Sequence, residues 1–135
     1  GGRGIKDWAL LELTEPIQFN DHIQPACLPR FPIKTQGNDS VCYVMGVGLN
    51  GPEETSYPEV VQFLRVKQVP CVIPPDGPNV VDCYENNNLL RRVCSGDSGS
   101  PVLCLDDAKR WTVVAVASQS FPCNIFFLPG FAHYT

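Results

Sequence analysis

The chain has 135 residues, of which 44% are hydrophobic and 18% are charged, a balance that suits one globular domain and excludes disorder as its main state. Its net charge of -4, with ten lysines and arginines scattered along the sequence, argues against a nucleic-acid partner. No run approaches the roughly 18 apolar residues of a membrane-spanning helix, and the first residues contain no apolar signal core. The sequence therefore predicts no membrane span in this chain.

Short apolar segments, divided by thirteen prolines and eleven glycines, predict an all-β domain. In chain order, the expected strands are 8–13, 41–48, 60–69, 100–105 and 111–118. Residues 20–34 contain three prolines and are expected to form an extended connection over a surface. Several short strands at this spacing favour a barrel or a sandwich.

Seven cysteines in a chain of this length, without the paired C-x-x-C spacing of a structural zinc site, predict disulfides in an oxidising compartment and no metal. Asn38-Asp39-Ser40 is an acceptor motif for N-glycosylation and agrees with a secreted or extracellular location. Because seven is odd, at least one thiol has no partner within the chain. We expect that cysteine to bond outside it.

Residues 92–104 read RVCSGDSGSPVLC and contain the run Gly96, Asp97, Ser98 and Gly99. In isolation such a run would be an ordinary turn between strands. Together with its flanks it resembles the nucleophile loop of the trypsin/chymotrypsin-like serine endopeptidases, whose usual form is Gly-Asp-Ser-Gly-Gly-Pro followed by a short strand ending in cysteine. Ser100 replaces the last glycine of that pattern.

The resemblance extends from about Asp7 to Tyr134. Residues 7–13 look like the family's catalytic-aspartate strand, 23–29 like its inter-barrel connection and 42–48 like the strand that enters its second barrel. The resemblance implies the second six-stranded antiparallel barrel of a double barrel, together with the last strand of the first. Residues 1–20 would end the first barrel, 21–40 would connect the barrels, and 41–135 would form the second.

The family's roles can be carried over to matching positions. Ser98 would be the nucleophile and Asp7 the aspartate that orients a histidine base. The N–H groups of Gly96 and Ser98 would form the oxyanion hole. Asp97 would pair with an α-amino terminus created when a zymogen is cleaved. No cofactor is implied.

The expected substrate-binding residues depart from the family pattern. Ser118, Gln119 and Ser120 stand where Ser-Trp-Gly is usual, and Gly130 is expected to line the same wall. Arg92 occupies the position at which trypsin-like members have an aspartate. It would disfavour lysine and arginine substrates, either by selecting an acidic side chain or by filling the pocket.

By resemblance, the cysteines would form three internal pairs and leave Cys27 for a segment outside this chain. The implied pairs are Cys42–Cys104, Cys71–Cys83 and Cys94–Cys123. Spacing alone does not choose among the possible connectivities.

The triad's histidine is missing, since His22 and His133 both follow the aspartate strand, whereas the family's catalytic histidine precedes it. We therefore expect a fragment, with the histidine in a missing N-terminal portion linked through Cys27. Two functions remain open. The first is part of a secreted serine endopeptidase acting on peptides or proteins, with this chain inactive alone. The second is a protease-like binding module that has lost turnover.

Overall fold

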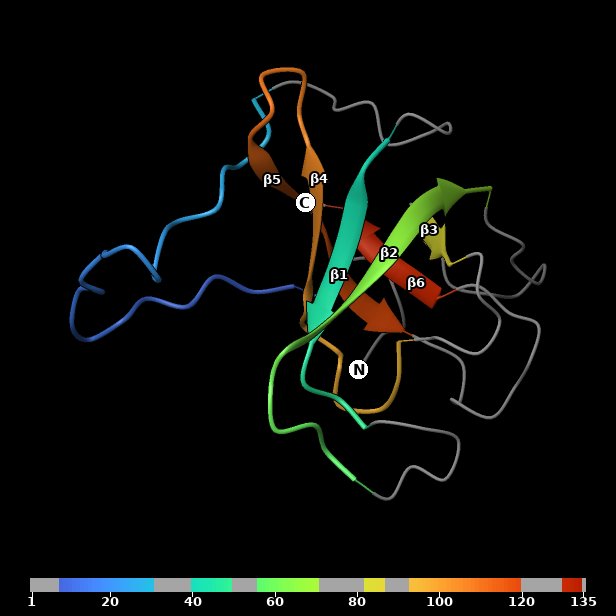
Figure 1. The fold of residues 1–135 in the computed structure, drawn as a ribbon, viewed down its shortest axis with the longest axis horizontal. Coiled ribbons are helices and arrows are strands. Elements are labelled where there is room, and N and C mark those ends of the chain that lie inside the picture. Colours follow the sequence, from blue (N-terminus) through green and yellow to red (C-terminus); the bar gives the residue numbers. More distant parts are fainter. Residues whose placement is uncertain are drawn as a thin grey trace.

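The computed structural model describes residues 8–30, 40–49, 56–70, 82–86, 93–119 and 130–134, with residue 119 and the last of these ranges described by their backbone. The described strands are β1 (Cys42–Gly46), β2 (Gln62–Val69), β3 (Asp82–Glu85), β4 (Pro101–Leu105), β5 (Trp111–Gln119) and β6 (Gly130–Tyr134). They form one closed antiparallel barrel in the order β1-β2-β3-β6-β5-β4 (Figure 1). The all-β expectation is confirmed.

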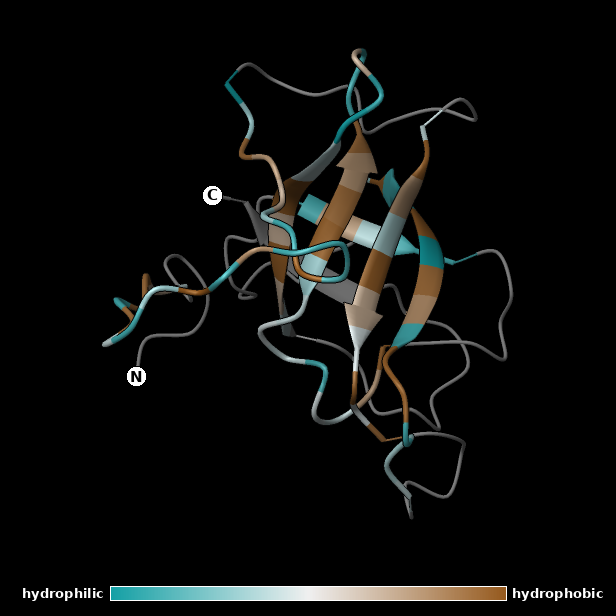
Figure 2. Cartoon of the chain, turned by 60° about the vertical axis from the view of Figure 1, so that its left-hand side comes forward, coloured by the Kyte–Doolittle hydropathy of each residue, from teal (hydrophilic) through white to brown (hydrophobic). Residues whose placement is uncertain are grey.

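The core follows the two-residue period of the strands. Cys42 and Val44 of β1 are buried, whereas Met45 faces outward. Val102 and Cys104 of β4 alternate in the same way. The buried cluster inside the barrel consists of Cys42, Val44, Val66, Tyr84, Val102, Cys104, Val114 and Ala115. Apolar segments along neighbouring strands are visible in brown in Figure 2.

The barrel closes where β1 meets β4. Cys42 pairs with Cys104 in the register of these two strands, and the same residues form a disulfide between Cα atoms 4.1 Å apart. Both side chains are buried. This predicted pair is therefore confirmed.

A tight turn joins β4 to β5. The N–H of Asp106 donates to the carbonyl of Arg110, and the Arg110 guanidinium bonds back to the Asp106 carboxylate at 2.9 Å. Lys109 takes the left-handed conformation (φ 61°) that such a turn requires. These local contacts place β5 beside β4.

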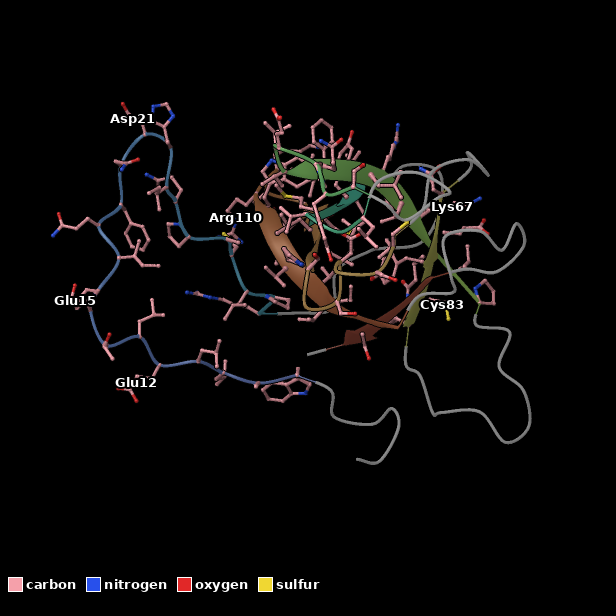
Figure 3. The ribbon with its side chains drawn as sticks, turned by 90° about the horizontal axis from the view of Figure 1, so that it is seen from below. Glu12, Glu15, Asp21, Lys67, Cys83 and Arg110 are labelled. Carbon is pink, nitrogen blue, oxygen red and sulfur yellow. A yellow bond between two sulfur atoms is a disulfide. The ribbon has the colours of Figure 1, made fainter. Side chains whose placement is uncertain are left out.

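The prediction of a strand at residues 8–13 is wrong. Residues 8–30 form an arm that leaves the barrel (Figure 1), and 8–13 are unpaired among the described residues, with Leu10 and Leu11 exposed. Strong apolar character does not make a strand when no neighbouring strand accepts its hydrogen bonds. Figure 3 shows Glu12, Glu15 and Asp21 on this arm, away from the barrel.

The arm returns to the barrel at Cys27. Its N–H donates to the carbonyl of Trp111, and its carbonyl accepts from the N–H of Val113, at 3.0 and 2.9 Å. The first residues of β5 are thus paired with β4 on one side and with Cys27 on the other. Among the described residues, no helix has the length and apolar character needed to cross a membrane.

Candidate active site

The loop between residues 93 and 100 is anchored to β5. The N–H of Gly99 donates to the carbonyl of Ala117 at 2.7 Å, and the N–H of Ala117 donates to the carbonyl of Ser100 at 2.8 Å. This reciprocal pair of hydrogen bonds places Ser98 close to the last residues of β5, which include Ser118. The predicted nucleophile and the start of the predicted substrate wall are therefore neighbours.

Ser98 lies between two glycines with positive φ, Gly96 at 93° and Gly99 at 87°. Residues with a side chain rarely adopt this backbone conformation, which explains why glycine is required at both ends of the tight loop. Ser98 itself is exposed. The fold thus presents its hydroxyl to solvent, as a nucleophile requires.

The Asp97 carboxylate turns inward and binds two backbone N–H groups. Oδ1 accepts from the N–H of Gly48 at 2.7 Å, and Oδ2 accepts from the N–H of Cys94 at 2.8 Å. The N–H of Leu49 adds a bond to the carbonyl of Ser95 at 2.8 Å. One charged side chain thereby joins the loop to the segment that follows β1.

Gly46 and Gly48 make room for this carboxylate. A Cβ on Gly48 would lie 2.6 Å from the Asp97 carboxyl carbon, and a Cβ on Gly46 would also collide with Asp97. Sequence reasoning identified Asp97 but missed both glycines. The available signal was the Gly-x-Gly pattern at the end of the strand, which begins at the last residue of β1.

Four N–H groups of the loop have no acceptor among the described residues, namely those of Val93, Ser95, Gly96 and Ser98, and the last two are the expected oxyanion donors. Gly96 and Ser98 are both exposed, so their N–H groups are open to water and to a ligand. The ring of Tyr57 lies near Gly96, with its Cε1 atom 3.4 Å from where a Cβ on Gly96 would stand. Chemically, this arrangement offers an exposed hydroxyl next to two free donors.

The structure brings together only some of the predicted site residues. Ser118 and Gln119 are at the end of β5, and the backbone of Gly130 opens β6, whose residue Phe131 pairs with Gln119. The remaining predicted residues lie outside the described ranges; they are Asp7, Arg92, Ser120, Asn38, Cys71 and Cys123.

The other cysteines agree in part with the expected scheme. Cys83 and Cys94 are each disulfide-bonded. Their expected partners lie outside the described ranges. Cys27 is a free, half-buried thiol.

The described residues contain no side-chain cluster suited to a metal ion. His22 lies on the arm, where its N–H donates to the Asn20 side chain, and His133 pairs with Val116 through the backbone of β6. His22 is exposed.

This combination of a β-barrel and a Gly-Asp-Ser-Gly loop with two free donors belongs to a known family. Residues 2–135 match the trypsin domain, and the chain is a member of the trypsin family. It is 31% identical over 131 residues to the serine protease harobin of Hydrophis hardwickii. The match covers 93% of this chain and 46% of that protein, so the chain spans about half the length of the relative.

Proposed function

We propose that this chain is part of a secreted serine endopeptidase, in which it supplies the nucleophile and the oxyanion donors. The observation that carries the proposal is the exposed Ser98 beside the unpaired N–H groups of Gly96 and Ser98. Family membership supports peptides as the substrate class. Residues 1–20 are assigned to the first barrel, 21–40 to the connection and 41–135 to the second barrel.

In the proposed reaction, the Ser98 oxygen attacks the carbonyl carbon of the substrate while a histidine from outside this chain takes its proton. The two free N–H groups stabilise the negative oxygen that forms. The carbon–nitrogen bond then breaks, and the amine leaves with the proton returned by the imidazole. Water hydrolyses the resulting ester and regenerates Ser98. Asp7 is proposed to orient the histidine.

Asp97 is proposed as the partner of an activated amino terminus, in addition to its two backbone bonds. A carboxylate has about four lone-pair sites, so an ammonium group has room to bind a carboxylate that already accepts two hydrogen bonds. The disulfides Cys71–Cys83 and Cys94–Cys123, glycosylation at Asn38 and secretion belong to the same proposal.

Arg92, with Ser118, Gln119, Ser120 and Gly130, is proposed to set the substrate preference. A permanent positive charge in the pocket would repel lysine and arginine, and it would pair with aspartate or glutamate. A profile over a peptide library tests this. Strong cleavage after basic residues would contradict it.

The test of the function uses the whole protein that contains this chain and a fluorophosphonate probe, which phosphonylates activated serines. We expect labelling at Ser98, located by mass spectrometry, together with peptide cleavage. Both should vanish in Ser98→Ala. The 135-residue chain alone should be neither labelled nor active, because it lacks the base.

A second candidate is a protease-like binding module. It is favoured by Arg92, Gln119 and Ser100, three positions at which the sequence departs from the family pattern. In that case the whole protein would bind peptides without labelling at Ser98.

A further inference from the structure

Ser100 stands where the family pattern has its last glycine, two residues after Ser98. Its backbone is fully paired, because its N–H donates to the carbonyl of Asp97 at 3.0 Å and its carbonyl accepts from the N–H of Ala117 at 2.8 Å. Its side-chain hydroxyl has no hydrogen-bonding partner among the described residues. The serine therefore adds a half-buried polar group that a glycine would not provide.

This hydroxyl lies beside the Asp97 carboxylate, against the end of β1. The Ser100 Oγ atom is 3.0 Å from where a Cβ on Gly46 would stand, and the Asp97 carboxyl carbon is 2.8 Å from the same point. Gly46 is the last residue of β1. The hydroxyl and the carboxylate are therefore neighbours on the same glycine, which leaves room for both side chains.

A hydroxyl beside a carboxylate stabilises it in two ways. The O–H dipole turns toward the negative charge, and the group fills space in which water would compete for the hydrogen bonds of the carboxylate. The bonds concerned are those that Asp97 accepts from the N–H groups of Gly48 and Cys94, at 2.7 and 2.8 Å. Because Asp97 is only half-buried, keeping water from this side of the carboxylate strengthens both bonds.

We propose that Ser100 is a positioning residue, whose hydroxyl keeps the Asp97 carboxylate in its inward orientation and so holds the oxyanion loop in shape from within this chain. An amino terminus that pairs with Asp97 would add to these contacts, and the loop would not depend on it for its shape. The proposal rests on the proposed function, since this shape matters for catalysis only if Gly96 and Ser98 supply the oxyanion donors.

The test measures amide hydrogen exchange by NMR in the 135-residue chain. In the unchanged chain, the N–H groups of Gly48 and Cys94 should exchange slowly, because both donate to the same carboxylate. Ser100→Gly, which restores the family residue, should make both groups exchange several-fold faster. The hydrogen-bonded N–H of Leu105, at the end of β4, is the internal reference and should not change.

Further variants separate the effect of the hydroxyl from that of the backbone. Ser100→Ala loses only the hydroxyl and should speed the exchange as Ser100→Gly does, whereas Ser100→Thr keeps the hydroxyl and should preserve slow exchange. Ser95→Ala removes an exposed hydroxyl from the same loop and is the matched control, without an expected effect. In an Asp97→Asn background, Ser100→Ala should add little, because its effect acts through the carboxylate.

Unchanged exchange at Gly48 and Cys94 in both Ser100→Gly and Ser100→Ala would overturn the proposal and show a serine without a role in the loop. Fast exchange of the two groups in the unchanged chain would overturn it as well. Faster exchange that includes Leu105 would show a general loss of stability and would contradict a positioning role.

The whole protein gives a second readout. There, Ser100→Ala should lower kcat several-fold and leave KM nearly unchanged, because the oxyanion donors act in the transition state. An equal rise in KM without a change in kcat would contradict the positioning role. A whole protein that cleaves no peptide, with amide exchange in the chain as expected, would contradict the proposed function alone.

Discussion

The Asp97 carboxylate and the N–H of Gly48 form a 2.7 Å hydrogen bond between residues 49 positions apart. This bond connects the loop that contains Ser98 to the end of β1. Because the same carboxylate also holds the N–H of Cys94, Asp97 acts as the central support of the candidate oxyanion loop.

Gly48→Ala should disrupt the loop, because the new methyl group would lie 2.6 Å from the Asp97 carboxyl carbon. In the whole protein we expect kcat to fall about 10²-fold, the effect of losing one oxyanion donor. Gly99→Ala is the control for steric crowding: its φ of 87° is strained, but nothing lies within 4 Å of the added carbon. Urea unfolding of the isolated chain should show the larger loss for Gly48→Ala, and the opposite order would contradict this account.

Asp97→Asn should destabilise the isolated chain by about 1–3 kcal/mol, since an amide nitrogen cannot accept the second backbone hydrogen bond. Asp107→Asn, a substitution at an exposed position of the β4–β5 turn, serves as the control and should have little effect. The free energy of unfolding in urea measures both. Equal stabilities for the two variants would show that Asp97 does not support the loop.

Because of Asp82, we expect the folded chain to become less stable as the pH rises. Burial raises its pKa above 3.8, against the smaller opposing effect of a hydrogen bond from Gln68. A carboxyl group with a raised pKa binds its proton more tightly in the folded chain, so its stabilising contribution is complete below pH 3.8 and is lost as the pH rises through the folded-state pKa. Asp82→Asn should therefore stabilise the chain at pH 7 and not at pH 3.

Asp106 should have the opposite effect: its contribution to the stability of the folded chain should decrease as the pH falls. Hydrogen bonds and the charge of Arg110 lower its pKa below 3.8, with the backbone bond from Arg110 as the largest cause. Its contribution is present above pH 3.8 and is lost as the pH falls through the folded-state pKa. Asp106→Asn should cost stability at pH 7, and the difference should disappear in strong acid. Thermal unfolding across this pH range checks both substitutions, and slopes of the same sign would refute the assignment.

Replacing Cys42 and Cys104 together by alanine should cost about 2–5 kcal/mol, the usual range for a native disulfide in a small domain. The bond spans 62 positions and joins the two strands that close the barrel. Both variants are made in the isolated chain, where Cys27→Ser is the matched control because that thiol is free and half-buried. If both variants unfolded at the same urea concentration, the bond would not contribute as expected.

Four strands of the barrel could be predicted because they are rich in valine, leucine and phenylalanine between turns. β3 (DCYE) and β6 (GFAHY) could not, since short segments with charged residues or glycine have little strand character of their own. They pair with each other, so their conformation depends on distant partners. Residues 8–13 show the reverse case, an apolar segment without a partner strand.

The candidate loop was predicted from its local motif, including Gly96, Asp97 and Ser98. The role of Gly48 was not, because no spacing rule connects residues 49 positions apart. The place of Ser100 beside Gly46 likewise depends on how the loop folds against β1, which the sequence does not specify.

The closure of the barrel between β1 and β4 determines how the chain can fold. These strands are far apart in the sequence, and the sheet keeps two open edges until they meet. Contacts between distant segments form slowly, and open edges pair with other chains in the meantime. Refolding should therefore lose material to aggregation at high protein concentration, and oxidising conditions that join Cys42 to Cys104 early should raise the yield.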